Sequence, residues 1–152
     1  RSLSLDLHAQ WKDLEGAGEF RFTPPIQVLL AFDQALDELE EEGGVTARAA
    51  RYRENHATLI AGMRKLGFKE YLKPEAQGYI ITSFHYMDHP RFSYKELYER
   101  LRNRDLIIYS GKVSNAACFR IGNIGRLFKA DMQVLLSSIG DVLREMQIGG
   151  AK

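Results

Sequence analysis

The chain has 152 residues, 45% hydrophobic and 27% charged, which is typical of a folded globular protein and excludes a disordered one. Lys and Arg number 21 against 20 Asp and Glu, so a net charge of +1 gives no overall basis for binding nucleic acid or a membrane surface. The single cysteine, Cys118, excludes an internal disulfide and favours a reducing, cytoplasmic location. No apolar run reaches transmembrane length.

The first 44 residues predict an arm followed by a helix. Leucines that alternate with polar residues predict an extended segment at Ser2–Leu7, and a short helix is expected over His8–Leu14. The two prolines that end Phe20–Pro25 disfavour helical backbone before them. A helix should follow and stop at Gly43, with an apolar stripe at helical spacing. This stripe comprises Val28, Leu29, Phe32, Ala35, Leu36 and Leu39.

The remaining residues predict the order helix, strand, helix, strand, strand, helix. The expected elements are helices at Val45–Leu66, after Ser93 and at Ala130–Gln147, and strands at Gly78–Tyr86, Leu106–Tyr109 and Cys118–Ile121. This order is typical of a compact two-layer α+β unit with helices on one face of a small sheet. We therefore expect two parts, 1–44 and 45–152, the first belonging to the edge of a different domain.

The pattern that best indicates a binding site is the run Cys118–Gly125, in which one arginine lies inside a short apolar strand that two glycines follow. A charge on such a strand is costly unless it is paired. The planar guanidinium of Arg120 suits a carboxylate, phosphate or phosphonate, and the glycines allow backbone or ligand to approach. Two alternatives remain open: an arginine paired with an acidic side chain, or one that points to solvent from an edge strand.

Other candidate residues favour structural roles. His85 and His89 have the spacing of a helical metal pair, but they fall on a predicted strand and its loop, where that spacing does not converge. Cys118 is interpreted as an inert buried residue, because no activating base can be placed beside it. The segment Tyr109–Ser114 lacks the glycine spacing of a P-loop and is interpreted as a turn, with Lys112 as a solvated lysine.

Thr23 is a candidate of a different kind. It precedes the two prolines and the predicted start of a helix, where free N–H groups and the helix dipole favour anions. Its hydroxyl is therefore suited to a phosphate group. The pattern alone favours the alternative, in which Thr23 caps the helix and binds no ligand.

Four segments together resemble one enzyme family. They are Arg1–Leu7 with Trp11, Phe20–Pro25, Tyr109–Ser114 and Cys118–Gly125. In this order they resemble 2-aminoethylphosphonate–pyruvate transaminases, which are pyridoxal-phosphate enzymes of the fold-type I aminotransferase class. The resemblance implies the small domain of such an enzyme, preceded by the tail of its large domain. The Arg-Ile-Gly segment alone is shared with wider relatives, whereas the combination is more specific.

The resemblance also implies an activity and two site residues. The family transfers the amino group of 2-aminoethylphosphonate to pyruvate, giving phosphonoacetaldehyde and L-alanine, with pyridoxal 5'-phosphate held by a lysine. The family's arginine that binds the acidic end of the substrate corresponds to Arg120. The threonine that reaches the cofactor phosphate of the neighbouring subunit corresponds to Thr23, which implies a homodimer with small-molecule substrates.

Two departures qualify this resemblance. The family's cofactor lysine precedes the segment that corresponds to Arg1–Leu7, so the chain resembles a carboxyl-terminal part that is expected to be inactive alone. The run Pro25–Gln27 replaces a more polar one, so the assignment of Thr23 has less support than that of Arg120. The alternatives are part of an alanine–glyoxylate or serine–pyruvate transaminase, or a free-standing, non-catalytic module for anion binding or dimerisation.

Overall fold

The computed structural model describes residues 3–111 and 116–148. The chain divides into two compact units, Arg1–Gly44 and Val45–Lys152, each of which is described by itself. Lys112 and Ser114, which belong to the predicted turn, lie outside the described residues. None of the helices in the described ranges is both long and apolar enough to cross a membrane.

The first unit contains a short 3-10 helix and two α-helices. The 3-10 helix covers Leu3–Leu5, α1 covers Leu7–Gly16 and α2 covers Ile26–Glu41. The predicted helix at His8–Leu14 is therefore confirmed, whereas the extended segment at Ser2–Leu7 is wrong over its described part. The physical reason is local: the carboxylate of Asp6 accepts the N–H of Ala9 at 3.0 Å and so caps α1.

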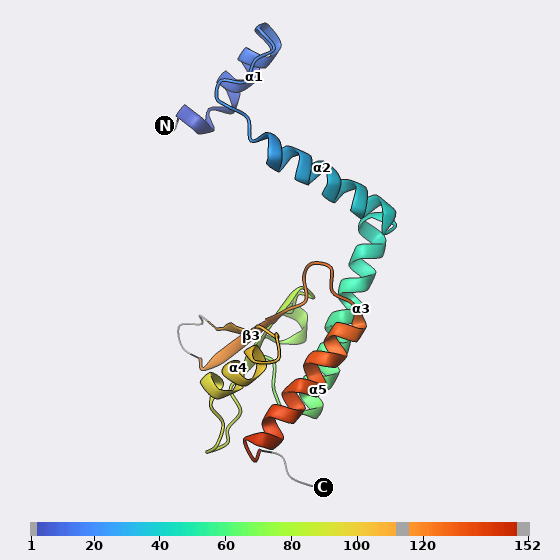
Figure 1. Cartoon of the computed structure of the whole chain (residues 1–152), viewed down its shortest axis with the longest axis vertical. Coiled ribbons are helices and arrows are strands. Elements are labelled where there is room, and N and C mark those ends of the chain that lie inside the picture. The colour runs from blue at the N-terminus through green and yellow to red at the C-terminus, as the bar shows by residue number, and fades with distance from the viewer. Residues whose placement is uncertain (1–2, 112–115, 149–152) are drawn as a thin grey trace. The chain divides into compact units, whose positions relative to one another are not determined.

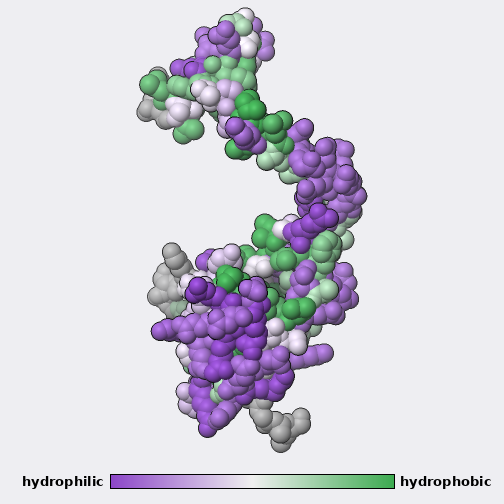
Figure 2. All heavy atoms as spheres, in the orientation of Figure 1, coloured by the Kyte–Doolittle hydropathy of each residue, from purple (hydrophilic) through white to green (hydrophobic). Residues whose placement is uncertain are grey.

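The predicted helix after the two prolines is confirmed as α2, and its apolar stripe lies at the surface. Val28 is 64% exposed and Phe32 60% exposed. Figure 2 shows hydrophobic residues over the first half of this helix and hydrophilic ones over its acidic end. No described residue of this unit buries the stripe, so its hydrophobic spacing is not explained by packing within the unit.

The second unit has the predicted order of elements. Its members are α3 (Gly44–Lys65), a 3-10 helix at Pro74–Ala76, β1 (Ile81–His85), α4 (Tyr94–Arg102), β2 (Tyr109–Ser110), β3 (Cys118–Gly122) and α5 (Lys129–Glu145). The strands form an antiparallel sheet in the order β1-β3-β2, so that β3 is central (Figure 1). The predicted α+β fold is therefore confirmed.

The core of this unit lies between the helices and one face of the sheet. Fully buried apolar side chains come from α3, α4, α5 and two strands: Leu59, Met63, Leu97, Leu101, Ile139, Val142, Phe84 and Phe119. The ring of Phe119 on β3 makes edge contact with Phe68 at a centroid distance of 5.4 Å. A methyl group at Gly62 would overlap Leu136, so this glycine lets α3 approach α5 closely.

Two predicted strands differ from the structure. The strand expected at Leu106–Tyr109 forms pairs only at Tyr109–Ser110, although Ile108 is buried as expected. Asp105 follows the end of α4 and has a positive φ of 60°. The residues after it carry the chain away from the helix, so strand pairing begins only at Tyr109. The strand expected over Gly78–Tyr86 is shortened to Ile81–His85.

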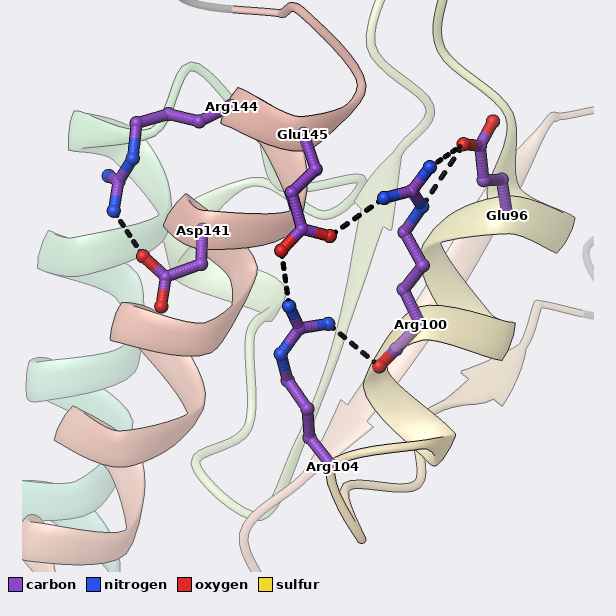
Figure 3. Close-up of polar contacts among 6 residues, drawn as sticks. All are labelled: Glu96, Arg100, Arg104, Asp141, Arg144 and Glu145. Atoms are coloured by element: carbon purple, nitrogen blue, oxygen red, sulfur yellow. Dashed lines mark hydrogen bonds and ion pairs between the residues drawn. The ribbon is translucent and has the colours of Figure 1, made fainter.

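Ion pairs join α4 to α5. The carboxylate of Glu145 on α5 accepts from Arg100 at 2.7 Å and from Arg104 at 2.5 Å, and Arg100 also binds Glu96 at 2.6 Å (Figure 3). The hydrogen bond from Arg100 lowers the pKa of Glu145 below its ordinary value of 4.5. A carboxylate with a lowered pKa stabilises the folded state above the ordinary pKa, and the effect is lost as the pH falls through the lowered value.

We expect Glu145→Gln to lower the stability of the protein slightly at neutral pH, because exposed ion pairs contribute little each. The difference from the wild type should shrink in about 1 M salt and vanish at acidic pH, where the carboxylate is protonated. Urea unfolding at several pH values and salt concentrations measures this. Asp141→Asn is the control, since the ion pair that the described residues give Asp141 is with Arg144 on its own helix. A difference that persists at low pH would show that the ion pairs are not its cause.

Candidate functional site

Arg120 lies at the middle of the central strand. Its partners across the sheet are Ser83 on β1 and Tyr109 on β2. Because side chains alternate along a strand, the buried neighbours Phe119 and Ile121 face the core and Arg120 faces the other way. We call the side of the sheet that carries Arg120 its outer face. An edge arginine, one of the two alternatives from the sequence, is therefore wrong.

The guanidinium of Arg120 has few partners. Its Nη2 donates to the carbonyl oxygen of Ser110 at 3.3 Å, while its Nε is buried and has no acceptor in the part of the chain that the structure describes. No carboxylate within the described ranges forms an ion pair with it. An arginine paired with an acidic side chain is thus also wrong for this part of the chain. A charged guanidinium without a carboxylate partner is costly where it is shielded from water, so an acid group that binds its accessible N–H donors would be favourable.

The outer face beside Arg120 has room for a ligand. Gly122 lies on this face two residues after Arg120, and a Cβ there would have only one near neighbour, the carbonyl oxygen of Ile80 at 3.9 Å. Packing among the described residues therefore does not require glycine at this position. Tyr109 and Ile81 flank the same face and are 58% and 46% exposed. The outer face is therefore an exposed surface with the cation Arg120 at its centre.

The segment after β3 is held by a set of buried contacts that the sequence did not indicate. Asn123 is fully buried, and its Nδ2 donates to the carbonyl oxygens of Tyr79 at 3.0 Å and Tyr52 at 3.3 Å. Its backbone N–H donates to Ile80 at 3.0 Å. These contacts bind the end of β3 to α3 and to the segment before β1. The only sequence signal for this role was a polar residue that follows an apolar strand and lies between Gly122 and Gly125.

A second group holds the loop that leads from β3 to α5. Arg51 donates from Nη1 to the carbonyl oxygens of Gly125 at 2.8 Å and Leu127 at 2.7 Å. Nδ2 of Asn55 donates to the same Leu127 oxygen at 2.7 Å. Gly125 has a positive φ of 93°, a backbone conformation that favours glycine, whereas Gly122 does not. The strand that carries Arg120 is therefore anchored on a rigid helix.

Thr23 lies in the first unit, between α1 and α2, whereas Arg120 belongs to the second. The N-cap of α2 is Pro25, not Thr23, and no side chain caps this helix. The predicted capping role of Thr23 is therefore wrong. Thr23 is exposed, and its hydroxyl has no partner among the described residues. Backbone acceptors occupy the N–H groups of Ile26 and Val28, which leaves the N–H of Gln27 beside it.

The remaining candidates have separate surroundings. Cys118 is buried on β3 as expected. The ring of His85 lies 5.3 Å from that of Tyr71, whereas Nδ1 of His89 accepts the N–H of Arg91 at 3.1 Å. The ranges 3–111 and 116–148 contain no group of His, Cys, Asp and Glu that is suited to a metal ion.

A cavity of about 320 Å³ lies elsewhere in the second unit, beside α3. Its lining includes His56, Arg64, Lys69 and Glu70, and Arg64 pairs with Glu70 at 2.7 Å. Burial lowers the pKa of His56, so the imidazole is neutral at physiological pH. Arg120 is not among the lining residues. Because Arg64 is already paired with Glu70, the cavity is a weaker candidate for binding an acid group than the outer face of the sheet.

The architecture is found in aminotransferases of known structure. The aspartate aminotransferase of subgroup IV from Thermus thermophilus matches with a TM-score of 0.78 and 22% identity over 96% of this chain and 40% of its own. An alanine–glyoxylate aminotransferase from Nostoc sp. matches with a TM-score of 0.80 and 22% identity over 92% of this chain and 37% of its own. At these identities the likeness establishes the fold.

Curated sequences are much nearer. The 2-aminoethylphosphonate–pyruvate transaminase of Salmonella schwarzengrund is 51% identical over 140 residues, which are 91% of this chain. The same values hold for the enzyme of Salmonella paratyphi C. The chain resembles 2-aminoethylphosphonate–pyruvate transaminases. It spans 38% of the length of these relatives and corresponds to their carboxyl-terminal part. No protein-family model matches the chain.

The resemblance deduced from the four sequence segments is therefore confirmed. The comparisons do not test the roles of individual residues, so the functions of Arg120 and Thr23 stay predictions. The structure supplies the geometry for the first: a cation on the central strand without a carboxylate partner among the described residues, on the face of the sheet that also carries Gly122.

Proposed function

We propose that this chain is part of a pyridoxal-phosphate-dependent transaminase that moves the amino group of 2-aminoethylphosphonate to pyruvate. The identity of 51% to curated enzymes of that name supports the substrate pair. The proposal concerns a full-length protein, because the chain spans 38% of those relatives. The lysine that holds the cofactor is expected outside this chain, and the chain alone is expected to be inactive.

Arg120 carries the proposal. Its side chain leaves the outer face of the sheet, and no carboxylate among the described residues pairs with its guanidinium. In the first half-reaction it binds the phosphonate of the amino donor, and in the second the carboxylate of pyruvate. One planar fork accepts both groups because each presents a pair of oxygen atoms to it. The contacts of Asn123 and Arg51 hold the strand, so that Arg120 presents the same geometry to both substrates.

Thr23 fits a phosphate of the cofactor in part. Its free hydroxyl and the N–H of Gln27 are two donors beside the start of α2, where the helix dipole favours an anion. Two donors do not complete a phosphate cradle, so further donors come from other parts of the enzyme. The bound cofactor supplies an electron sink for the transfer. The chain's own residues bind one end of the substrate and one end of the cofactor.

We further propose a cytoplasmic homodimer that acts in phosphonate breakdown. The resemblance assigns the phosphate that Thr23 reaches to the neighbouring subunit, which requires a second copy. The exposed apolar side chains of the first unit, among them Val28, Phe32 and Trp11, are suited to a covered surface. A single buried thiol agrees with a reducing compartment.

Substrate choice tests the proposed function. We expect the full-length protein, supplied with pyridoxal phosphate, to convert 2-aminoethylphosphonate and pyruvate to phosphonoacetaldehyde and L-alanine. Both products are measured directly with time. The alternative function, alanine–glyoxylate or serine–pyruvate transamination, is assayed in parallel with the corresponding amino acids. Activity with amino acids alone would overturn the proposal, and absence of both activities would favour the non-catalytic alternative.

A further inference from the structure

One further feature of the outer face is a tyrosine next to Arg120. Tyr109 on β2 lies directly opposite Arg120 in the antiparallel register, so the two side chains leave the same face of the sheet as nearest neighbours. The guanidinium reaches over this strand, since its Nη2 donates to the carbonyl oxygen of Ser110, the next residue after Tyr109. The cation and the phenol are therefore on the same side of the central strand.

The phenol of Tyr109 is free to bind a ligand as far as the described residues are concerned. Tyr109 is 58% exposed, and its hydroxyl has no hydrogen-bond partner within residues 3–111 and 116–148. Ser83, the other neighbour of Arg120, also carries a hydroxyl, but its side chain is short and stays near the backbone of β1. Of the two, Tyr109 has the longer side chain, and it belongs to the strand whose backbone the guanidinium of Arg120 contacts.

The acid groups of the two proposed substrates differ in shape, and this difference bears on the role of a hydroxyl next to Arg120. A carboxylate is planar and has two oxygen atoms, both of which a guanidinium fork binds. A phosphonate is tetrahedral and has three terminal oxygen atoms, as a phosphate monoester does, so one remains after the fork has bound two. A buried oxygen without a donor lowers affinity, and a donor beside the fork restores it.

We propose that the hydroxyl of Tyr109 donates a hydrogen bond to the third oxygen of the phosphonate and so selects phosphonate substrates at the Arg120 site. The inference rests on the proposed function, since it names the group that distinguishes the two substrates there. Pyruvate needs only Arg120. The phosphonate needs both residues, and Tyr109 is a specificity-determining residue for the amino donor.

Tyr109→Phe in the full-length enzyme is the test, because it removes one oxygen atom and keeps the ring. We expect kcat/KM for 2-aminoethylphosphonate to fall about tenfold, the loss typical of one hydrogen bond to a charged group. The value for pyruvate should stay unchanged. Steady-state kinetics with each substrate varied separately give both values. Tyr79→Phe is the matched control: it also removes a phenol, but its ring lies over Arg53, and both values should stay at wild-type level.

Each other outcome has a definite meaning. If Tyr109→Phe lowers the values for both substrates equally, or neither, the selective role of Tyr109 is wrong while the proposed function stands. Competition with methylphosphonate and with acetate gives an independent measure: the variant should bind the first more weakly and the second as before. If the wild-type enzyme does not act on 2-aminoethylphosphonate, the proposed function fails, and this inference fails with it.

Discussion

Arg120→Ala is expected to lower kcat/KM of the full-length enzyme for both 2-aminoethylphosphonate and pyruvate. The variant loses a bidentate, charge-assisted contact, and hydrogen bonds to charged groups contribute about 1.5–3 kcal/mol each. Two such bonds, about 3–6 kcal/mol together, correspond to a loss of about 10²- to 10⁴-fold in kcat/KM. Because the same guanidinium binds both acid groups in turn, the two half-reactions should lose similar amounts. Stopped-flow measurement of each half-reaction separates them.

Arg120→Lys is the informative companion. Lysine keeps the positive charge but has no planar fork, so this variant should recover only part of the loss. Stability should not fall in either variant, since the guanidinium has no ionic partner among the described residues and its Nε lacks an acceptor. Unfolding in urea checks this. Unchanged KM and kcat in Arg120→Ala would show that Arg120 is not the acid receptor.

Periodicity predicted the helices of the second unit well because burial and spacing agree there. In α5 the apolar residues that recur at helical spacing are buried, among them Met132, Ile139 and Val142. Ser93 caps α4 as expected, its hydroxyl accepting the N–H of Glu96 at 3.3 Å. Such signals are local, because a few neighbouring residues decide them.

Other features depend on parts of the chain that are distant in sequence, and periodicity does not contain them. The central place of β3, which decides that Arg120 is not at an edge, follows from pairing with β1 more than thirty residues earlier. The donor role of Asn123 depends on carbonyl groups of Tyr52 and Tyr79. At Ser2–Leu7 an alternating pattern competed with a helix cap at Asp6, and the cap prevailed over the described part.

The stripe on α2 illustrates a third case. Its spacing correctly predicted a helix, but the stripe is exposed in its own unit. Hydrophobic periodicity predicts an amphipathic helix, but it does not identify the surface against which the apolar side of the helix packs. The same limit applies to Thr23: its residue type suits a phosphate, but its role stays a prediction, because its hydroxyl has no partner among the described residues. The prediction for Thr23 came from the resemblance to a family and not from periodicity, because the resemblance compares the order of several segments along the chain.

Phe119→Ala should have the largest effect on stability. Phe119 is fully buried on β3, and its ring contacts those of Phe68, Phe84 and Tyr94 at centroid distances of 5.4, 5.9 and 5.8 Å. Removing a buried aromatic ring costs about 3–5 kcal/mol through lost burial and the cavity left behind. That is a large share of the 5–15 kcal/mol, roughly, that keeps a domain folded. Urea or thermal unfolding measures the loss.

Phe22→Ala is the matched control, since it removes the same ring from a side chain that is 54% exposed, and its effect should stay within about 0.5 kcal/mol. A loss in Phe119→Ala no greater than in this control would contradict the buried aromatic cluster. Phe119 and Arg120 are adjacent on one strand and face opposite sides of it. The first variant should therefore lose stability, and activity only as far as it unfolds, whereas Arg120→Ala should lose activity while it stays folded. This contrast separates the two faces of β3, one of which forms the core and the other the proposed site.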